Sequence, residues 1–264
     1  MDRPRPLTED DLDAIDTLRP HDWPPYRRTF ERYFALDCVR PWAFGGPDGL
    51  VAMGTLIDFG KTGWMAQVIT SAQRRGQGWG SKMVRFLLDQ AQGMGMHTVS
   101  LVATELGYPL YAAAGFRVEG EYAFWTRSTP APALPEASEE LKAWSESYGP
   151  RCLVLDRKAS GEGRAPYLRH DWSQGYVVPG EGYFLPTVGE GLVVAKNRRA
   201  GEPLLHRRID GASRVVVPLE NSWAPVLLSS RGFALEKRMR RMVWGRSLRR
   251  RPEWVGSRIG GNLG

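Results

Sequence analysis

The chain has 264 residues, of which 42% are hydrophobic, 25% charged and 11% aromatic, as in ordinary globular proteins. This composition excludes disordered, collagen-like and disulfide-scaffold classes, and no apolar run reaches the roughly 18 residues of a membrane-spanning helix. Two cysteines, Cys38 and Cys152, are too few for a disulfide framework or a cysteine-only zinc site. The first residues hold no apolar stretch that fits a secretory signal, so we expect a cytoplasmic protein without a membrane partner.

The net charge of +7 is unevenly distributed. Residues 1–130 carry 14 Lys and Arg against 15 Asp and Glu, whereas residues 131–264 carry 22 against 14. The basic second half fits either a solubilising surface or an acidic or phosphorylated partner. The arginine clusters at residues 238–241 and 249–251 have few aromatic neighbours, so we do not expect a nucleic-acid partner.

A proline-rich segment separates the two halves. Three prolines fall within residues 130–135, and proline removes backbone donors that helices and sheets need. We therefore expect an N-terminal domain over residues 1–130, a linker with a short connecting helix over residues 131–147, and a second domain over residues 148–264. The connecting helix is expected within residues 136–147.

Hydrophobic periodicity predicts alternating helices and strands in the first domain. A capped amphipathic helix begins after Thr8, where acidic residues are followed by apolar residues at helical spacing. Runs of apolar residues between glycine, proline and aspartate turns predict strands. This mixed order predicts an α/β (mixed α+β) fold with a mostly antiparallel central sheet flanked by helices. In chain order we expect helices after Thr8 and at 26–36, strands at 39–44, 50–58 and 64–70, a helix opened by the glycine turn at 76–80, a strand at 98–103, a helix at 109–114 and a strand at 116–127.

The second domain ends in the same order of elements as the first. A β-branched strand at 215–218 precedes a short helix at 221–230, a Gly-Phe pair and a strand that runs to Trp244. Residues 109–116 and 226–233 match at an offset of 117 residues, and each ends in Gly-Phe. One such match proves little, because glycine commonly follows a helix. The repeated order of strand, helix, Gly-Phe and strand indicates a duplicated fold.

A glycine-rich stretch from Gln73 to Ser81 lies between a predicted strand and an amphipathic helix. Its alternate glycines let the backbone turn sharply and approach a ligand closely. Amides of the first helical turn have no partner within the helix and favour an anion, and Arg74 and Arg75 add positive charge. The stretch fits a pyrophosphate cradle, with a glycine-rich turn that binds nothing as the alternative. Its spacing fits neither the Rossmann fingerprint nor the Walker loop.

The same stretch resembles the acetyl-CoA loop of the GNAT family of acyl-CoA-dependent N-acetyltransferases. Residues 73–78, with the sequence Gln-Arg-Arg-Gly-Gln-Gly, fit the family's pattern Q/R-x-x-G-x-G/A in full. Further along, the family usually has a leucine-tyrosine pair, three residues and then Gly-Phe, and here Leu110-Tyr111 precedes Gly115-Phe116 at this spacing. Two motifs in this order are more specific than either alone. The resemblance covers about residues 3–127.

The resemblance implies an acetyl-CoA site in the first domain. The pyrophosphate would lie on the amides of residues 76–81, and the pantetheine arm would run beside the strand at residues 68–70. Thr104 stands where relatives often have an asparagine that touches the pantetheine, which leaves this contact open. The residues implied in acetyl-CoA binding are Val68, Ile69, Thr70, Gln73, Arg74, Arg75, Gly76, Gln77, Gly78, Trp79, Gly80, Ser81 and Thr104.

The resemblance also implies one catalytic residue. Tyr111 matches the position of the family's general acid, and a phenol with an ordinary pKa of about 10 can give a proton to the leaving thiolate at neutral pH. The alternative is a half-buried ring whose hydroxyl has a structural partner. The general base stays open among Asp58, Glu105 and His21, because the strand at 64–70 contains no acid.

The second domain loosely resembles the C-terminal domain of two-domain members of the family. It departs from the pattern where chemistry would be done. Residues 196–201 contain one glycine in place of the glycine-rich loop, and Leu228 stands at the offset position of Tyr111. We therefore expect a degenerate copy that shapes the acceptor pocket or a homodimer, and not a second acetyl-CoA site.

The prediction is thus an acetyl-CoA-dependent N-acetyltransferase that acts on an amine of a small molecule, peptide or protein. The alternative is a non-catalytic module on the same fold that senses acyl-CoA or binds nucleic acid or another partner. Acetyl-CoA is the one co-substrate expected. No metal is expected, because the four histidines are scattered without paired spacing.

Overall fold

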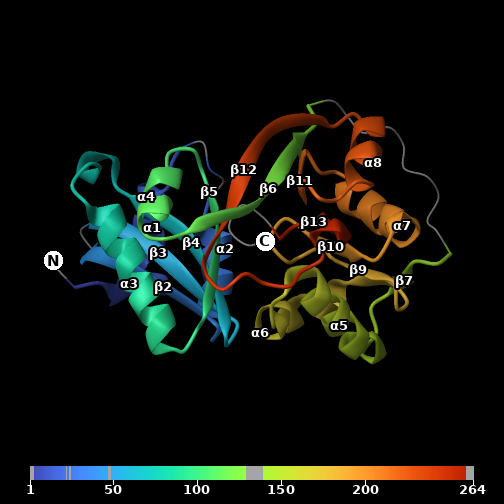
Figure 1. Ribbon diagram of the computed structural model, residues 1–264, viewed down its shortest axis with the longest axis horizontal. Helices are drawn as coiled ribbons and strands as arrows, with labels where there is room; N and C mark the ends of the chain where they lie inside the picture. Colours follow the sequence, from blue (N-terminus) through green and yellow to red (C-terminus); the bar gives the residue numbers. More distant parts are fainter. Residues whose placement is uncertain (1–2, 22, 24, 47–48, 129–138, 260–264) are drawn as a thin grey trace. The chain divides into compact units, whose positions relative to one another are not determined.

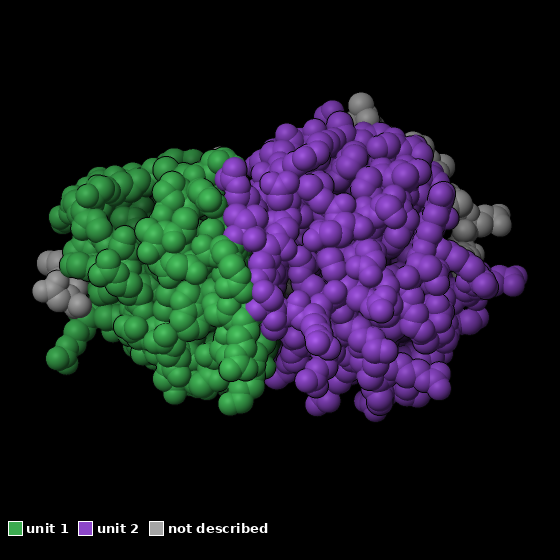
Figure 2. Space-filling view, in the orientation of Figure 1, with its two compact units in different colours: residues 1–117, 242–246 green, residues 118–241, 247–264 purple. Residues whose placement is uncertain are grey.

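The computed structural model describes residues 3–21, 23, 25–46, 49–128 and 139–259, and the chain forms two compact units (Figures 1 and 2). Unit 1 comprises residues 1–117 and 242–246, and unit 2 comprises residues 118–241 and 247–264. Each unit is therefore built from two separate stretches of chain. The short stretch 242–246, near the C-terminus, belongs to the N-terminal unit.

The first five strands of unit 1 form three antiparallel pairs and one parallel pair. Neighbours in the sheet follow chain order from β1 to β5, and the end of β12 lies beside β5. Antiparallel ladders join β1 to β2, β2 to β3 and β3 to β4, whereas β4 and β5 are parallel. The predicted strands and the mostly antiparallel sheet are confirmed. The bounds are β1 (Arg5–Pro6), β2 (Val39–Gly46), β3 (Gly49–Asp58), β4 (Thr62–Thr70), β5 (Thr98–Ala103) and β12 (Ala234–Gly245).

Helix α3 (Trp79–Gly93) covers one face of this sheet (Figure 1). Its buried residues Met83 and Leu87 recur at helical spacing and meet β3 at Gly54. A Cβ at Gly54 would lie only 2.8 Å from Leu87 Cδ1, so the absence of a side chain there lets the helix approach the strand. The other helices of unit 1 are α1 (Leu12–Leu18), α2 (Arg27–Phe34) and α4 (Tyr108–Ala113), with 3-10 turns at Glu9–Asp11 and Ala72–Arg74.

Unit 2 contains a three-stranded part and a five-stranded sheet. In the first part β6 (Arg117–Thr126), whose first residue is assigned to unit 1, lies between β12 and β11 (Arg214–Pro218). The five-stranded sheet has α5 and α6 on one side and α7 and α8 on the other (Figure 1). Its strands in spatial order are β13 (Val255–Ser257), β10 (Leu192–Ala195), β9 (Gly182–Leu185), β8 (Tyr176–Val178) and β7 (Lys142–Ala143). The helices are α5 (Gly149–Ser160), α6 (Ala165–Leu168), α7 (Arg198–Ile209) and α8 (Ala224–Ser230), with 3-10 turns at Glu146–Tyr148, Arg169–Gln174 and Pro252–Trp254.

The connecting helix predicted within residues 136–147 is wrong for the part that the structure describes. Residues 129–138 lie outside the described residues, and Lys142–Ala143 forms strand β7, which pairs antiparallel with β8. The Trp144 amide donates to the Gly175 carbonyl, and the Trp144 ring lies 4.8 Å from that of Trp172. These distant partners decide the conformation, whereas the local sequence pattern favours a helix.

Helices α4 and α8 end in the same way, as the internal match predicts. Gly115 and Gly232 follow them with φ of 89° and 77°, a left-handed conformation that glycine adopts without strain. In each case the following phenylalanine amide bonds back into the helix, Phe116 to Tyr111 O and Phe233 to Leu228 O. The two halves therefore share a helix ending at the 117-residue offset, which supports a duplicated fold.

Among the described residues, no helix has the length and apolarity needed to cross a membrane. Within the same residues, no group of three or more His, Cys, Asp and Glu side chains is arranged to hold a metal ion.

We expect Gly245→Ala to destabilise unit 1 by more than 2 kcal/mol, because a Cβ there would lie 2.1 Å from the His97 carbonyl oxygen. Gly211→Ala is the matched control, since its φ of +67° is also left-handed but no atom lies within 4 Å of its Cβ position. The control should cost about 1 kcal/mol. Urea unfolding followed by tryptophan fluorescence measures both, and equal losses would contradict the prediction.

Candidate active site

The glycine-rich loop before α3 adopts a conformation that only glycine accepts readily. Gly76 and Gly78 have φ of 74° and 80°, in the left-handed region. A Cβ at either position would have no atom within 4 Å, so backbone conformation and not crowding demands glycine. The loop therefore presents its main chain to open space.

The start of α3 offers unpaired backbone amides to that space. Gly78 is the N-cap, has no side chain to cap the helix, and accepts the first ladder bond, from the Lys82 amide. The amides of residues 79–81 consequently have no partner within the helix. Arg74 and Arg75 form no ion pair with any described carboxylate. Free amides, a helix dipole and two cations together favour a polyanion such as a pyrophosphate.

Gly80 brings three elements of the predicted site together. A Cβ on this residue would lie 3.3 Å from Leu110 Cδ2 in α4 and 3.5 Å from Thr70 Oγ1 at the end of β4. The first turn of α3 thus contacts both the strand that carries Val68, Ile69 and Thr70 and the helix that carries Tyr111. The sequence motifs, which are far apart along the chain, meet at this point.

Strand β4 leaves its parallel partner part-way along its length. The register with β5 covers only Thr62 to Trp64, and the remaining residues of β4 continue without that ladder. Opposite β3 the register also slips, because Met53 pairs with Ile69 whereas Thr55 pairs with Ala66. One residue of β3 therefore faces two of β4, which is a β-bulge at residues 67–68 and leaves backbone groups there without a regular partner. The sequence shows only a lone glutamine in an apolar run at this point.

Tyr111 lies in α4 with its ring buried against Phe116, at a centroid distance of 5.9 Å. The residue is 8% exposed, and burial raises the pKa of its phenol well above the usual value. A phenol in this state keeps its proton at neutral pH. A hydroxyl that stays protonated at neutral pH is suited to donate a proton.

Two predicted site residues also have structural partners. Thr104 Oγ1 accepts a hydrogen bond from the Gly107 amide at 3.0 Å, which starts the turn into α4. Gln73 Oε1 accepts from Ser71 Oγ at 2.6 Å, and its carbonyl accepts from Gln77 Nε2. These bonds fix the loop and the start of α4, and they leave the Thr104 hydroxyl hydrogen available to a ligand.

Comparisons with known proteins agree with this geometry. Residues 8–116 match the acetyltransferase (GNAT) family. This match covers less than half of the chain and lies within unit 1, and it identifies an acyltransferase domain there. The co-substrate of the family is acetyl-CoA. The predicted recognition, activity class and co-substrate are confirmed, and no curated protein matches the sequence significantly.

Solved structures resemble the chain over both units. A putative acetyltransferase from Pyrococcus horikoshii shares 19% identity at a TM-score of 0.81, covering 99% of this chain and 95% of that one. A GCN5-related N-acetyltransferase from Sphaerobacter thermophilus shares 16% identity at a TM-score of 0.62, covering 94% of this chain and 98% of that one. A tandem GNAT protein from the clavulanic acid biosynthesis pathway shares 15% identity at a TM-score of 0.59, covering 92% of this chain and 98% of that one. At these identities the likeness shows the fold, here the fold of a tandem GNAT protein.

The three candidates for a general base lie differently in the GNAT unit. Asp58 pairs with Gly63 at the opposite end of the β3–β4 hairpin from Thr70, and it accepts from the Gly60 amide. Its place beside the hairpin turn argues against a role at the loop. Glu105 comes two residues after the end of β5, next to Thr104, and His21 lies between α1 and α2.

The corresponding helix start in the second GNAT-like unit is already satisfied by the chain itself. Asn197 caps α7, its Oδ1 accepting from the Ala200 amide at 3.0 Å. The nearby cations are paired, Lys196 with Glu181 at 2.9 Å and Arg199 with Glu140. A cavity of about 350 Å³ at this point is lined by two carboxylates, Glu140 and Glu181, and by two cations, Lys142 and Arg199.

The slot that would hold a pantetheine is also filled in the second unit. The order β10, α7, β11, α8, β12 repeats the order β4, α3, β5, α4, β6, so β10 and β11 correspond to β4 and β5. β13 pairs with β10, and the Arg258 amide that follows it donates to Val216 O in β11. The C-terminal strand therefore bonds to both strands that would flank a ligand.

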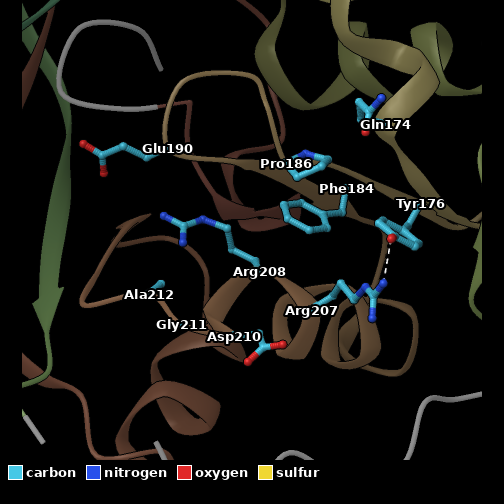
Figure 3. A pocket seen from close by; sticks show the side chains of 10 residues that line it. All are labelled: Gln174, Tyr176, Phe184, Pro186, Glu190, Arg207, Arg208, Asp210, Gly211 and Ala212. Carbon is cyan, nitrogen blue, oxygen red and sulfur yellow. Dashed lines mark hydrogen bonds between the residues drawn. The ribbon is translucent and has the colours of Figure 1, made fainter. Parts of the chain in front are cut away.

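A second cavity, of about 390 Å³, lies at the other end of α7 (Figure 3). Arg207 donates to the Tyr176 hydroxyl at 2.6 Å and stacks on its ring, whereas Arg208 donates to two backbone carbonyls. Glu190, also on its wall, is paired with Arg214. Most of the charged groups here bond other parts of the chain, and the cavity is remote from the helix start that would bind an anion.

We expect Gly76→Val to weaken acetyl-CoA binding about tenfold or more, because the side chain strains the loop and displaces its amides. Gly60→Val is the matched control, since Gly60 has a similar φ of 82° and equally open surroundings but lies in the β3–β4 turn. Calorimetric titration should show one site per chain, with the affinity reduced only in the first variant. Equal affinities in both variants would contradict the loop assignment.

Proposed function

We propose that the chain transfers the acetyl group of acetyl-CoA to the nitrogen of an amine on a small molecule, peptide or protein. The observation that carries this proposal is the meeting of three elements at Gly80. There the uncapped start of α3, the end of β4 and the helix of Tyr111 converge. This arrangement combines an anion site, a strand edge and a proton donor.

The fit between this site and acetyl-CoA rests on the chain's own groups. The amides of residues 76–81, with Arg74 and Arg75 beside them, suit the pyrophosphate. Val68, Ile69 and Thr70 belong to the part of β4 beyond its ladder with β5, where backbone groups can bond the pantetheine arm. Thr104 adds a hydroxyl at the end of β5. When bound, acetyl-CoA supplies the activated acetyl group.

The acid and the charge-stabilising group follow from the same geometry. The amine nitrogen forms a bond to the carbonyl carbon as the carbon–sulfur bond breaks, and the electron pair of that bond leaves on sulfur. The β4 bulge offers a backbone N–H to the carbonyl oxygen, where negative charge develops. Tyr111 gives its proton to the thiolate, and the amine's proton goes to water or to a base that the sequence leaves open.

We also propose that unit 2 is a degenerate copy without a second acetyl-CoA site. Four features support this: the Asn197 cap, the carboxylates beside α7, Leu228 in the place of Tyr111, and β13 between β10 and β11. A cytoplasmic location fits the two free, buried cysteines, Cys38 and Cys152.

Tyr111→Phe should lower kcat by about 10²- to 10⁴-fold and leave acetyl-CoA affinity unchanged, because only the transferable proton is lost. Tyr108→Phe, in the same helix, is the control and should keep the wild-type kcat. Release of free CoA in the presence of an amine measures turnover, and calorimetry measures affinity. Wild-type turnover in Tyr111→Phe would show that another group is the acid.

The raised pKa of Tyr111 predicts a specific pH dependence. The acid must be protonated to act, and a pKa above its usual value keeps it protonated to higher pH. We therefore expect kcat to hold from neutral pH to at least about pH 10, the ordinary pKa of a phenol. A fall in kcat between pH 7 and 9 that disappears in Tyr111→Phe would contradict this assignment.

A further inference from the structure

Gln67, in the middle of β4, has an unusual backbone conformation. Its φ of 45° makes it the one non-glycine residue with positive φ in the part of the chain that the structure describes. For a residue with a Cβ this left-handed conformation costs about 1–2 kcal/mol. The strain coincides with the β-bulge, next to the residues proposed for the pantetheine arm.

The bulge turns the Gln67 side chain away from α3. Met65 and Val68, on either side, pack into the core cluster that contains Met83 and Leu87 of α3. The Gln67 amide faces the opposite side of the sheet, where its Nε2 donates to Tyr33 Oη in α2 at 3.0 Å. Without the bulge, strict alternation from Met65 would place Gln67 on the face of α3 and Val68 on the face of α2.

The other atom of the same amide lacks a partner. Gln67 is 4% exposed, and its Oε1 is enclosed without a hydrogen bond from any described residue. An enclosed acceptor left unpaired is costly and uncommon, and it points to a missing donor. The bond to Tyr33 fixes the amide plane, so Oε1 is held in one direction.

A second unpaired polar atom lies on this face of the sheet. Thr55, opposite Ala66 in the β3–β4 ladder, has a buried hydroxyl without a partner among the described residues. Its neighbours Gly54 and Leu56 face α3, so Thr55 points to the side of α2, as Gln67 does. Two unsatisfied polar groups on one face of the sheet, Gln67 Oε1 and the Thr55 hydroxyl, suit a ligand that forms hydrogen bonds there.

We propose that Gln67 Oε1 accepts a hydrogen bond from the attacking amine and orients its lone pair toward the acetyl group, while Tyr33 holds the amide in place. This inference rests on the proposed acetyl transfer. Gln67 is a contact to the substrate and not a base, because a carboxamide takes no proton at neutral pH. The acceptor therefore reacts as a free amine whose proton leaves to water, and it must carry an N–H to donate.

The test compares Gln67→Met with Gln67→Glu in the full chain. Methionine keeps the length of the side chain without the acceptor oxygen, and glutamate keeps an oxygen at the same place. The acceptors are a lysine-free peptide with a free α-amino group, an N-terminally blocked peptide with one lysine, and kanamycin. Gln67→Met should lower kcat about 10- to 100-fold with unchanged acetyl-CoA affinity, and Gln67→Glu should recover part of the loss.

The pH profile separates positioning from a merely structural role. For wild type, the acid limb of kcat/KM should follow the acceptor's own pKa and lie about two pH units lower for the α-amino peptide than for the lysine peptide. Gln67→Glu introduces a titrating group that the wild-type protein lacks, so the acid limb of kcat/KM should shift in this variant. Identical acid limbs for the two peptides would overturn the proposal that the amine reacts without a protein base.

The outcomes distinguish this inference from the proposed function. If wild type acetylates none of the three acceptors, the acetyl-transfer proposal fails and this inference fails with it. If wild type acetylates one of them and Gln67→Met keeps wild-type kcat and KM, only the inference fails. Thermal unfolding checks each variant. If Gln67→Met does not fold, Tyr33→Phe is tested in its place. We expect a smaller fall in kcat for Tyr33→Phe than for Gln67→Met. An unchanged kcat in Tyr33→Phe would contradict the proposal.

Discussion

The structure of unit 1 depends on the departure of β4 from β5 after a short parallel ladder. Strands that pair along their whole length satisfy their backbone groups and leave nothing for a ligand. Here the ladder ends after Trp64, and the bulge at residues 67–68 interrupts the pairing with β3 on the other side. Backbone groups therefore become available at one end of the strand, beside the uncapped start of α3. The proposed acetyl-CoA site depends on that local loss of regular pairing.

Much of the fold was predictable because local sequence patterns determine many of its elements. Alternating runs of apolar residues and turns gave β2, β3 and β4, and the glycine loop followed by apolar residues at helical spacing gave α3. The glycine-rich loop and Tyr111 could also be identified as candidate site residues from the sequence, because each belongs to a recognisable motif. These features depend on residues close in sequence.

Other features depend on contacts that local patterns do not encode. Lys142–Ala143 forms a strand because β8 lies beside it, although the sequence around it favours a helix. The bulge at Gln67 arises from packing on both faces of the sheet, with Val68 held by the α3 side and Gln67 held by Tyr33. The pairing of β13 with β10 joins segments some sixty residues apart and carries no motif. Each was missed for the same physical reason: its partner lies far along the chain.

The assignment of residues 242–246 to unit 1 has a consequence for how the protein is made. Met242 is fully buried in the core of the N-terminal unit, and Trp244 packs against that core. During synthesis, residues 118–241 of unit 2 leave the ribosome before these residues, which therefore emerge long after the rest of unit 1. The sheet of the N-terminal unit is complete only when most of unit 2 has been made. A gene cut at the proline-rich segment would give an N-terminal fragment that lacks its own final strand.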